Sequence, residues 1–151
     1  IIRVNKFDEK SANEFATKIA MAHSTGQKVI PVIIDSYGGQ VYSLMTMVAA
    51  IKSSDLPVAT IVEGKAMSCG AVLLSFGEEG LRFASPDATV MIHDVSSGGH
   101  GKIEDYFKKK VFNKKHADWF MDAPEAKKHG LVNHLRVPKL NIKVNVDIDF
   151  E

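Results

Sequence analysis

Hydrophobic residues recur at helical spacing in two segments of the first half of the chain. Asp8, or Ser11 with Glu14 three residues later, can cap a first helix that continues to about residue 23. A second helix is predicted for residues 41–52. In both segments, apolar residues three and four positions apart form a stripe that can pack on a core. The stripes consist of Ala12, Phe15, Ile19 and Ala22, and of Leu44, Met47, Val48 and Ile51.

Continuous apolar runs between these helices predict strands that are buried on both faces. Residues 29–34 read Val-Ile-Pro-Val-Ile-Ile without polar alternation, as expected of an inner strand of a parallel sheet. Residues 58–62 and 89–93 predict two further strands, and Gly64 is expected to end the first of these. The alternation of strands and helices predicts an α/β fold with a mainly parallel sheet.

The C-terminal part of the chain shows other patterns. Residues 96–101 predict a Gly-Ser loop, and a charged helix is expected over about residues 102–119. Residues 123–129 predict a short helix with Gly130 as its C-terminal cap. From residue 140 to 150, every even position is apolar, which is the strongest strand pattern in the chain. Such a strand needs a partner sheet or a partner subunit.

Composition and charge argue against several classes of protein. The chain has 19 Lys and Arg against 18 Asp and Glu, a net charge of +1, which gives no basic footprint for nucleic acid or an anionic membrane. The six His residues show no metal-ligand spacing, and no apolar run reaches the roughly 18 residues of a membrane span.

The single cysteine, Cys69, forbids an intrachain disulfide and favours a reducing compartment, the cytoplasm or an organelle matrix. No signal peptide is visible, and the start at Ile1 within a predicted strand is expected of a trimmed sequence.

Three segments with chemically useful groups follow the predicted strands. The carboxyl ends of parallel strands joined by right-handed crossovers lie on one side of the sheet. Residues 36–39 (Ser-Tyr-Gly-Gly), residues 64–69 and His93 are therefore expected on the same side.

Each of these segments also has a plain structural interpretation. Ser68 lies at a strand-to-helix turn, where free N–H groups suit an oxygen nucleophile and its oxyanion, but a serine there is more often a helix cap. The paired glycines permit close backbone approach in an ordinary turn or beside a substrate carbonyl. His93 suits a core position or a general base. Asp118, predicted on a helix beside Trp119-Phe120-Met121, suits solvated surface or partial burial.

Together these segments resemble the ClpP protease family. Residues 64–71, Gly-Lys-Ala-Met-Ser-Cys-Gly-Ala, resemble its nucleophile segment, and residues 90–93, Val-Met-Ile-His, resemble its catalytic-histidine strand at the same spacing of 25 residues. Residues 118–126 and 130–132 resemble its aspartate segment and closing helix, and residues 36–39 resemble its Ser-Pro-Gly-Gly turn. The resemblance runs from about residue 1 to residue 135.

The resemblance implies a ClpP/crotonase-like α/β fold, a spiral of repeated β-β-α or βαβ units with a mainly parallel sheet. Residues 1–151 would form one domain. Its head would comprise about residues 1–101 and 120–135, and its handle about residues 102–119. The predicted C-terminal strand, residues 139–151, would be an extension beyond what the family pattern includes.

The resemblance also implies an activity, that of the proteolytic subunit of an ATP-dependent Clp protease. Ser68 would be the nucleophile of a serine endopeptidase, His93 its general base and Asp118 the acid that orients the imidazole, while the backbone N–H groups of Gly39 and Cys69 would form the oxyanion hole. Homo-oligomers, two stacked rings of seven subunits, would enclose the sites. A AAA+ unfoldase would use ATP and feed in unfolded polypeptides. No metal or cofactor is expected in this chain, which lacks a phosphate-loop motif.

The chain departs from the family pattern in several places. Tyr37 replaces the usual proline of the turn, Asp94-Val95 replaces Gln-Pro after the histidine, and Ala117 stands where an arginine is frequent. The handle is short, which we attribute to residues absent from the sequence between about 108 and 111. The given residues do not include a segment that resembles the family's N-terminal axial loop.

Several alternatives remain open at this point. Cys69 at a helix N-terminus is a second candidate nucleophile, and Lys65, expected to face solvent, a second candidate base. The chain as a whole also suits a catalytically silent ring subunit, an acyl-CoA enzyme of the crotonase fold, or a binding module on the same scaffold.

Overall fold

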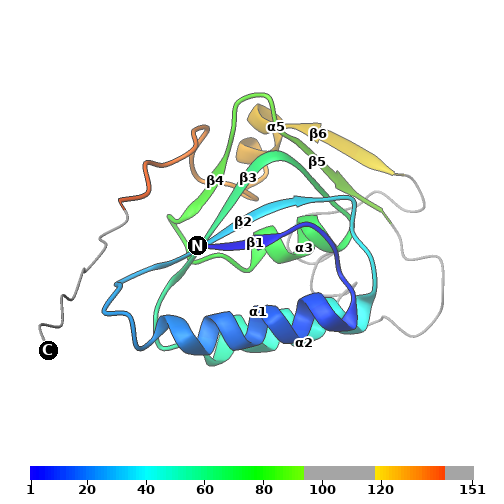
Figure 1. Ribbon diagram of the computed structural model, residues 1–151. Coiled ribbons are helices and arrows are strands. Elements are labelled where there is room, and N and C mark those ends of the chain that lie inside the picture. Colours follow the sequence, from blue (N-terminus) through cyan, green and yellow to red (C-terminus); the bar gives the residue numbers. More distant parts are fainter. Residues whose placement is uncertain (94–117, 142–151) are drawn as a thin grey trace, which may run out of the picture.

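The computed structural model describes residues 1–93 and 118–141 (Figure 1). Helices and strands alternate through the first half, and a short strand and helix follow after residue 118. The strands are β1 (Ile2–Val4), β2 (Ile30–Ser36), β3 (Val58–Met67), β4 (Arg82–Ala84), β5 (Thr89–Ile92) and β6 (Trp119–Asp122). The helices are α1 (Glu9–Ala22), α2 (Val41–Ser53), α3 (Cys69–Ser75) and α5 (Ala123–Lys128).

One six-stranded sheet organises these elements, in the order β1-β2-β3-β5-β6 with β4 paired to β3. Every pair is parallel except β5–β6, which is antiparallel. The predicted α/β class with a mainly parallel sheet is therefore confirmed. Several predictions lie outside the described residues. They concern the loop of residues 96–101, the handle up to residue 117, most of the C-terminal strand, and the positions Asp94, Val95 and Ala117.

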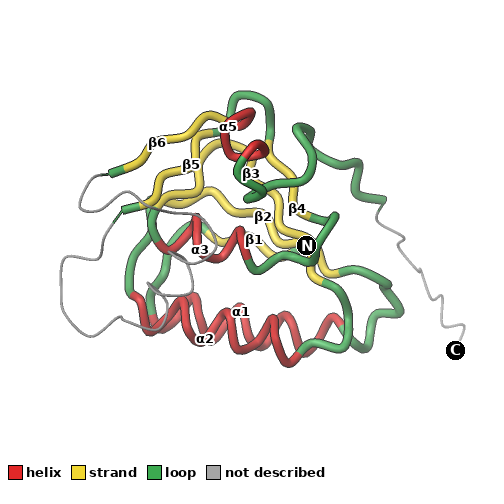
Figure 2. Tube along the Cα trace, turned by 180° about the vertical axis from the view of Figure 1, so that it is seen from behind, coloured by secondary structure: helices red, strands yellow, loops and turns green. Residues whose placement is uncertain are grey.

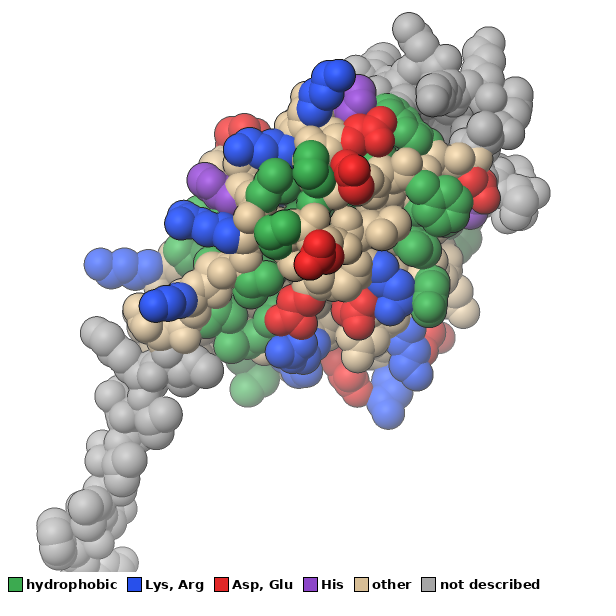
Figure 3. Space-filling model, turned by 90° about the horizontal axis from the view of Figure 1, so that it is seen from above, with side chains coloured by type: hydrophobic (Ala, Val, Ile, Leu, Met, Phe, Trp, Pro, Cys, Tyr) green, Lys and Arg blue, Asp and Glu red, His purple; other side chains and the backbone are tan. Residues whose placement is uncertain are grey.

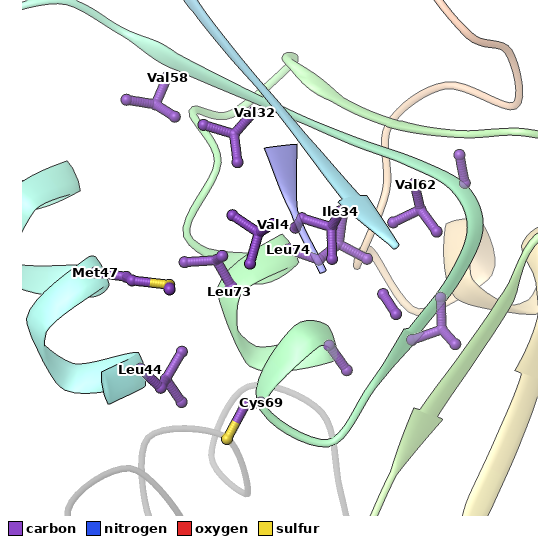
Figure 4. Packing of buried hydrophobic residues seen from close by; sticks show 14 of the residues in the cluster. Val4, Val32, Ile34, Leu44, Met47, Val58, Val62, Cys69, Leu73 and Leu74 are labelled. Carbon is purple, nitrogen blue, oxygen red and sulfur yellow. The ribbon is translucent and has the colours of Figure 1, made fainter. Parts of the chain in front are cut away.

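The core lies between the sheet and its helices. The two long helices, α1 and α2, run side by side below the sheet, with α3 between them and the strands (Figures 1 and 2). Apolar side chains of all three layers meet there (Figure 4), among them Val4, Val32, Ile34, Leu44, Met47, Val62 and Leu74. A smaller cluster of Ile33, Ala59, Ile61 and Phe83 packs on the opposite face, with Leu140 against it. The strands are thus buried on both faces, as their unbroken apolar runs predict.

Helix α1 begins with a capping box that decides between the two predicted caps. Asp8 is the N-cap, because its Oδ1 accepts a 2.7 Å hydrogen bond from the Ser11 N–H. Ser11 in turn accepts one from the Asp8 N–H at 3.0 Å. These reciprocal bonds satisfy two N–H groups that the first turn would otherwise leave unpaired, and they hold the pKa of Asp8 below its ordinary value.

Strand β3 continues past Gly64, contrary to the expected end there. Ile34 of β2 lies opposite Val62, whereas Ser36 lies opposite Ala66, so residues 63–65 form a bulge opposite Asp35. Before the bulge β3 pairs with β4, and from Lys65 onward it pairs with β5. A glycine inside a strand often marks such a bulge, which is the physical reason why Gly64 did not end β3.

In the region after residue 118, the structure contradicts two predictions and confirms one. Trp119 is not the end of a helix but the first residue of β6, with Asp118 just before it. Aromatic residues pack well on a sheet, so pairing of the short run Trp-Phe-Met with β5 stabilises it more than a position at a helix end would. The predicted short helix is present as α5, and Gly130, with φ of 75°, follows its C-cap as expected. Leu140 is not in a strand, although one was predicted from that residue.

The surface shows no segregation of charge on the face seen in Figure 3, where basic and acidic side chains alternate among apolar ones. In the described ranges, no helix is long and apolar enough to cross a membrane.

Candidate active site

Ser68 occupies a sharp turn between β3 and α3. Its backbone has φ of 54° and ψ of −117°, and it is the one non-glycine residue with positive φ in residues 1–93 and 118–141. The turn is held because the Ser68 N–H donates to the Met91 carbonyl at 2.9 Å and its own carbonyl accepts from Ala71 at 3.0 Å. The side chain makes no capping hydrogen bond to α3. Ser68 is therefore the N-cap residue of α3 by position, but its hydroxyl is not used for capping.

The hydroxyl of Ser68 meets the imidazole of His93 instead. The distance from Oγ to Nε2 is 2.7 Å, short for an O–H···N hydrogen bond. The β3–β5 register explains this contact, because Met67 lies opposite Met91 and each strand then delivers its next residues to the same edge of the sheet. The His93 side chain is 32% exposed, so it is not a satisfied core histidine. With Nε2 unprotonated, it can accept the Ser68 proton.

Asp118 lies on the other side of the same imidazole. Ile92 of β5 is opposite Trp119 of β6, and the antiparallel register therefore brings Asp118 opposite His93. Residues opposite each other in a sheet share a face. The distance from Asp118 Oδ1 to His93 Nδ1 is 3.7 Å, and the Asp118 side chain is 61% exposed. This distance suits an ion pair but exceeds that of a hydrogen bond.

The turn of residues 36–39 lies directly against Ser68. The Gly38 N–H donates to Ser36 Oγ at 3.0 Å. Gly38 has φ of 110°, and a Cβ on it would lie 2.9 Å from the Cβ of Ser68. Gly39 is held against the segment after β1, where a Cβ would lie 2.5 Å from the carbonyl oxygen of Phe7. Only glycine permits this close approach at either position.

The predicted oxyanion donors, the backbone N–H groups of Gly39 and Cys69, belong to the turn before α2 and to the start of α3. The Phe7 carbonyl accepts its 2.8 Å hydrogen bond from Gln40, the residue after Gly39. Cys69 is the first residue of α3, where helix geometry leaves the N–H without an intrahelical acceptor. The Cys69 thiol lies 3.4 Å from the Gly39 carbonyl, so the two predicted oxyanion donors belong to segments in contact.

Comparison with known proteins agrees with this arrangement. The sequence model of a family described as Clp protease matches residues 1–110. An ATP-dependent Clp protease proteolytic subunit of Deinococcus radiodurans is 29% identical over 153 residues, covering 85% of this chain and 75% of the relative. One from Bacteroides thetaiotaomicron is 31% identical over 157 residues, covering 87% of this chain and 71% of the relative. The chain belongs to the Clp protease family.

Membership of the Clp protease family makes the chain a peptidase and confirms the resemblance read from its motifs. It favours a protease over the acyl-CoA enzyme that the same fold class allowed. The match reaches residue 110 and includes Ser68 and His93, while Asp118 lies beyond it.

The structure also argues against the two alternative catalytic groups, Cys69 as the nucleophile and Lys65 as the base. The Cys69 side chain is buried and donates to the Gly39 carbonyl, and burial raises the pKa of its thiol, which disfavours the reactive thiolate. The ammonium of Lys65 is 2.8 Å from Asp35 Oδ1, so it is engaged away from Ser68. The expectation that Lys65 faces solvent is corrected too, since its side chain is only 26% exposed.

Sequence reasoning named the paired glycines and Lys65 but missed Asp35 and the contact that it makes. Asp35 of β2 accepts a 2.8 Å hydrogen bond from Lys65 Nζ of β3. Gly64, between an apolar run and Lys65, was the available signal, because a glycine in a strand points to a bulge and to close backbone approach.

Proposed function

We propose that this chain is a serine endopeptidase that acts as the proteolytic subunit of an ATP-dependent Clp protease. The observation that carries the proposal is the 2.7 Å contact between Ser68 Oγ and His93 Nε2, made at a strained turn beside two glycines. A hydroxyl held by an imidazole in this way is the recurring arrangement of an activated serine nucleophile.

The reaction follows from the positions of these groups. Ser68 Oγ attacks the carbonyl carbon of a peptide bond while its proton passes to His93 Nε2. The Gly39 and Cys69 N–H groups stabilise the oxyanion that forms. When the C–N bond breaks, His93 gives the proton to the leaving amine, and an acyl-enzyme ester remains on Ser68. Water then attacks that ester, again through His93, and releases the acid. Asp118 favours the imidazolium that exists in both steps.

The partners follow from the names of the relatives, which are ATP-dependent proteolytic subunits. We propose that this chain likewise works with a AAA+ unfoldase, which binds the ATP and delivers unfolded polypeptides. Copies of the chain would stack as two rings of seven in a reducing compartment such as the cytoplasm, with no metal or cofactor of their own.

Substitution of Ser68 and His93 tests the proposal. The assembled protein should cleave a fluorogenic peptide and bind a fluorophosphonate covalently, and Ser68→Ala should abolish the labelling. Ser68→Ala and His93→Ala should each lower kcat by roughly 10⁴-fold or more. Ser53→Ala, at the far end of α2, is the control and should keep the parent rate.

Two results would contradict the proposal. The first is cleavage by Ser68→Ala near the parent rate, which excludes Ser68 as nucleophile. The second is an assembled parent protein that neither cleaves peptides nor takes the label, which would identify a catalytically silent subunit. Sedimentation measured alongside the assay separates this second result from a failure to assemble.

A further inference from the structure

The bulge in β3, residues 63–65, divides that strand into two parts with different neighbours. Up to Val62 the strand pairs with β4 inside the core, and from Lys65 it pairs with β5 and leads to Ser68. Across the bulge lies Asp35, followed along β2 by the turn that carries Gly39. The regular ladder of hydrogen bonds is interrupted at this point. Beyond the bulge, β2 and β3 pair again at Ser36 and Ala66, so a group that bridges the bulge adds to this one contact in fixing the relative position of the two turns.

Lys65 spans it. Its Nζ is 2.8 Å from Asp35 Oδ1 and 4.5 Å from the centroid of the Tyr37 ring. The ammonium thus bonds a carboxylate on β2 and lies over an aromatic ring in the adjoining turn, a favourable place for a cation. Gly64 completes the packing, because a Cβ there would lie 3.2 Å from Asp35 Oδ1.

The contact between Lys65 and the Tyr37 ring matters because Tyr37 belongs to the turn that lies against Ser68. Tyr37 precedes Gly38, which touches Ser68, and Gly39, whose N–H is the proposed oxyanion donor. A proline at this position, usual in the pattern that the turn resembles, would fix φ through its ring. Tyr37 carries no such restraint, and its side chain is 75% exposed. The cation of Lys65 contacts its ring instead.

We propose that Lys65 is a positioning residue that, through Asp35 and Tyr37, sets the distance between the Gly39 N–H and Ser68 Oγ. The inference rests on the proposed function and adds to it the group that aligns the oxyanion hole. Lys65 does not act as a base, because its hydrogen bond to Asp35 raises its pKa and keeps it protonated. Its effect falls on kcat, since the oxyanion exists only after attack.

Kinetics of Lys65→Met in the assembled protein test this role, because methionine keeps much of the apolar stem and removes the cation. Its kcat should fall roughly 10- to 100-fold, the loss expected of a misplacement near 1 Å, with KM unchanged. Binding of a peptide boronate, which forms a tetrahedral adduct on Ser68, should weaken by a similar factor. Lys65→Arg, which keeps the charge and suits both the carboxylate and the ring, should restore most of the rate.

Lys52→Met is the matched control. It removes another cation from an aromatic ring, since Lys52 Nζ lies 5.4 Å from the centroid of the Phe76 ring, and Phe76 is at the end of α3 away from Ser68. Its kcat should equal that of the parent protein. Asp35→Asn should reproduce the loss seen in Lys65→Met, and the double variant should lose no more than either single one, because both remove the same contact.

The outcomes distinguish failure of the proposed protease function from failure of the positioning role of Lys65. Parent-like cleavage by Ser68→Ala overturns the proposed function and this inference with it. A protein whose cleavage depends on Ser68 but whose Lys65→Met variant keeps the parent kcat overturns the inference alone. A loss in Lys65→Met that comes with a fall in melting temperature of more than about 3 °C, or that Lys65→Arg does not repair, shows a merely structural role and also overturns it.

Discussion

Asp118 Oδ1 lies 3.7 Å from His93 Nδ1, on the opposite side of the ring from the Ser68 hydroxyl. The carboxylate is mostly exposed, and water and salt therefore screen its attraction for the imidazolium. The two contacts of the ring thus differ in strength, and the site should depend far more on the serine–histidine contact than on the aspartate.

Asp118→Asn should accordingly cost less activity than His93→Ala. We expect kcat/KM to fall roughly 10- to 100-fold in Asp118→Asn, against roughly 10⁴-fold in His93→Ala. Steady-state cleavage of a fluorogenic peptide measures both, with Asp122→Asn, at the N-cap of α5, as a control that keeps the parent rate. Equal losses in Asp118→Asn and His93→Ala would mean that the working enzyme closes the gap between carboxylate and ring.

Gly38→Ala should inactivate the protein through a steric effect on Ser68. The new Cβ would lie 2.9 Å from the Cβ and 3.3 Å from the Oγ of Ser68, and one of the two turns must move. Gly80→Ala is matched in backbone, with φ of 84°, but nothing lies within 4 Å of its added Cβ. Both variants should lose about 1–2 kcal/mol of stability from left-handed alanine, and only Gly38→Ala should also lose cleavage. If a folded Gly38→Ala variant keeps its cleavage activity, the turn of residues 36–39 can move without displacing Ser68, and the prediction is wrong.

Cys69 should matter to the pH dependence of stability and not to catalysis. Burial raises the pKa of its thiol, so the folded protein holds this proton more tightly than the unfolded chain does. The resulting stability is complete below the pKa of a free thiol and is lost as pH rises from there through the pKa of the folded state. Denaturant unfolding of the parent protein between pH 7 and 10 should show this decline, and Cys69→Ala should show a flatter curve.

The same variant also tests the choice of nucleophile. Cys69→Ala keeps the backbone N–H at position 69 and should retain both peptide cleavage and fluorophosphonate labelling. Loss of both in a folded Cys69→Ala variant would contradict the assignment of Ser68 and favour the thiol.

Arg82 should be essential to stability. It is 3% exposed, and its guanidinium donates to the carbonyls of Gly77, Gly130 and Leu131 and to the carboxylate of Glu79. Arg82→Met would leave buried carbonyls without donors, at about 1–3 kcal/mol each. A loss of about 3 kcal/mol or more is expected in denaturant unfolding. Arg136→Met, at an exposed position, is the control and should change the free energy of unfolding by less than about 0.5 kcal/mol. An effect of Arg82→Met as small as this would contradict a stabilising role of Arg82.

The elements that sequence predicted best are those with a long periodic signal. Helix α1 ends at Ala22, next to the predicted end, and α2 covers Val41–Ser53, because each has a full apolar stripe facing the sheet. Strand β4, by contrast, has three residues, one of them the buried Arg82. A charged residue interrupts the apolar run, and nothing local shows that distant carbonyls satisfy it.

In the candidate site, too, some residues could be predicted from local sequence and others depend on strand register. Ser68 and His93 follow apolar strands in a recognisable order, and their convergence follows from the parallel sheet. The position of Asp118 depends on the antiparallel register of β5 and β6, which a short apolar run cannot specify. The bridge from Lys65 to Asp35 depends on a two-residue slip in register, which no local pattern encodes.

The positive φ of Ser68 has a consequence for how such chains lose activity. A left-handed serine costs folding energy, of order 1–3 kcal/mol, that a glycine at the same place would largely recover. Replacing Ser68, the proposed nucleophile, by glycine would thus yield an inactive but more stable subunit. Loss of this hydroxyl carries no cost in folding stability, so stability alone does not retain a serine at this position.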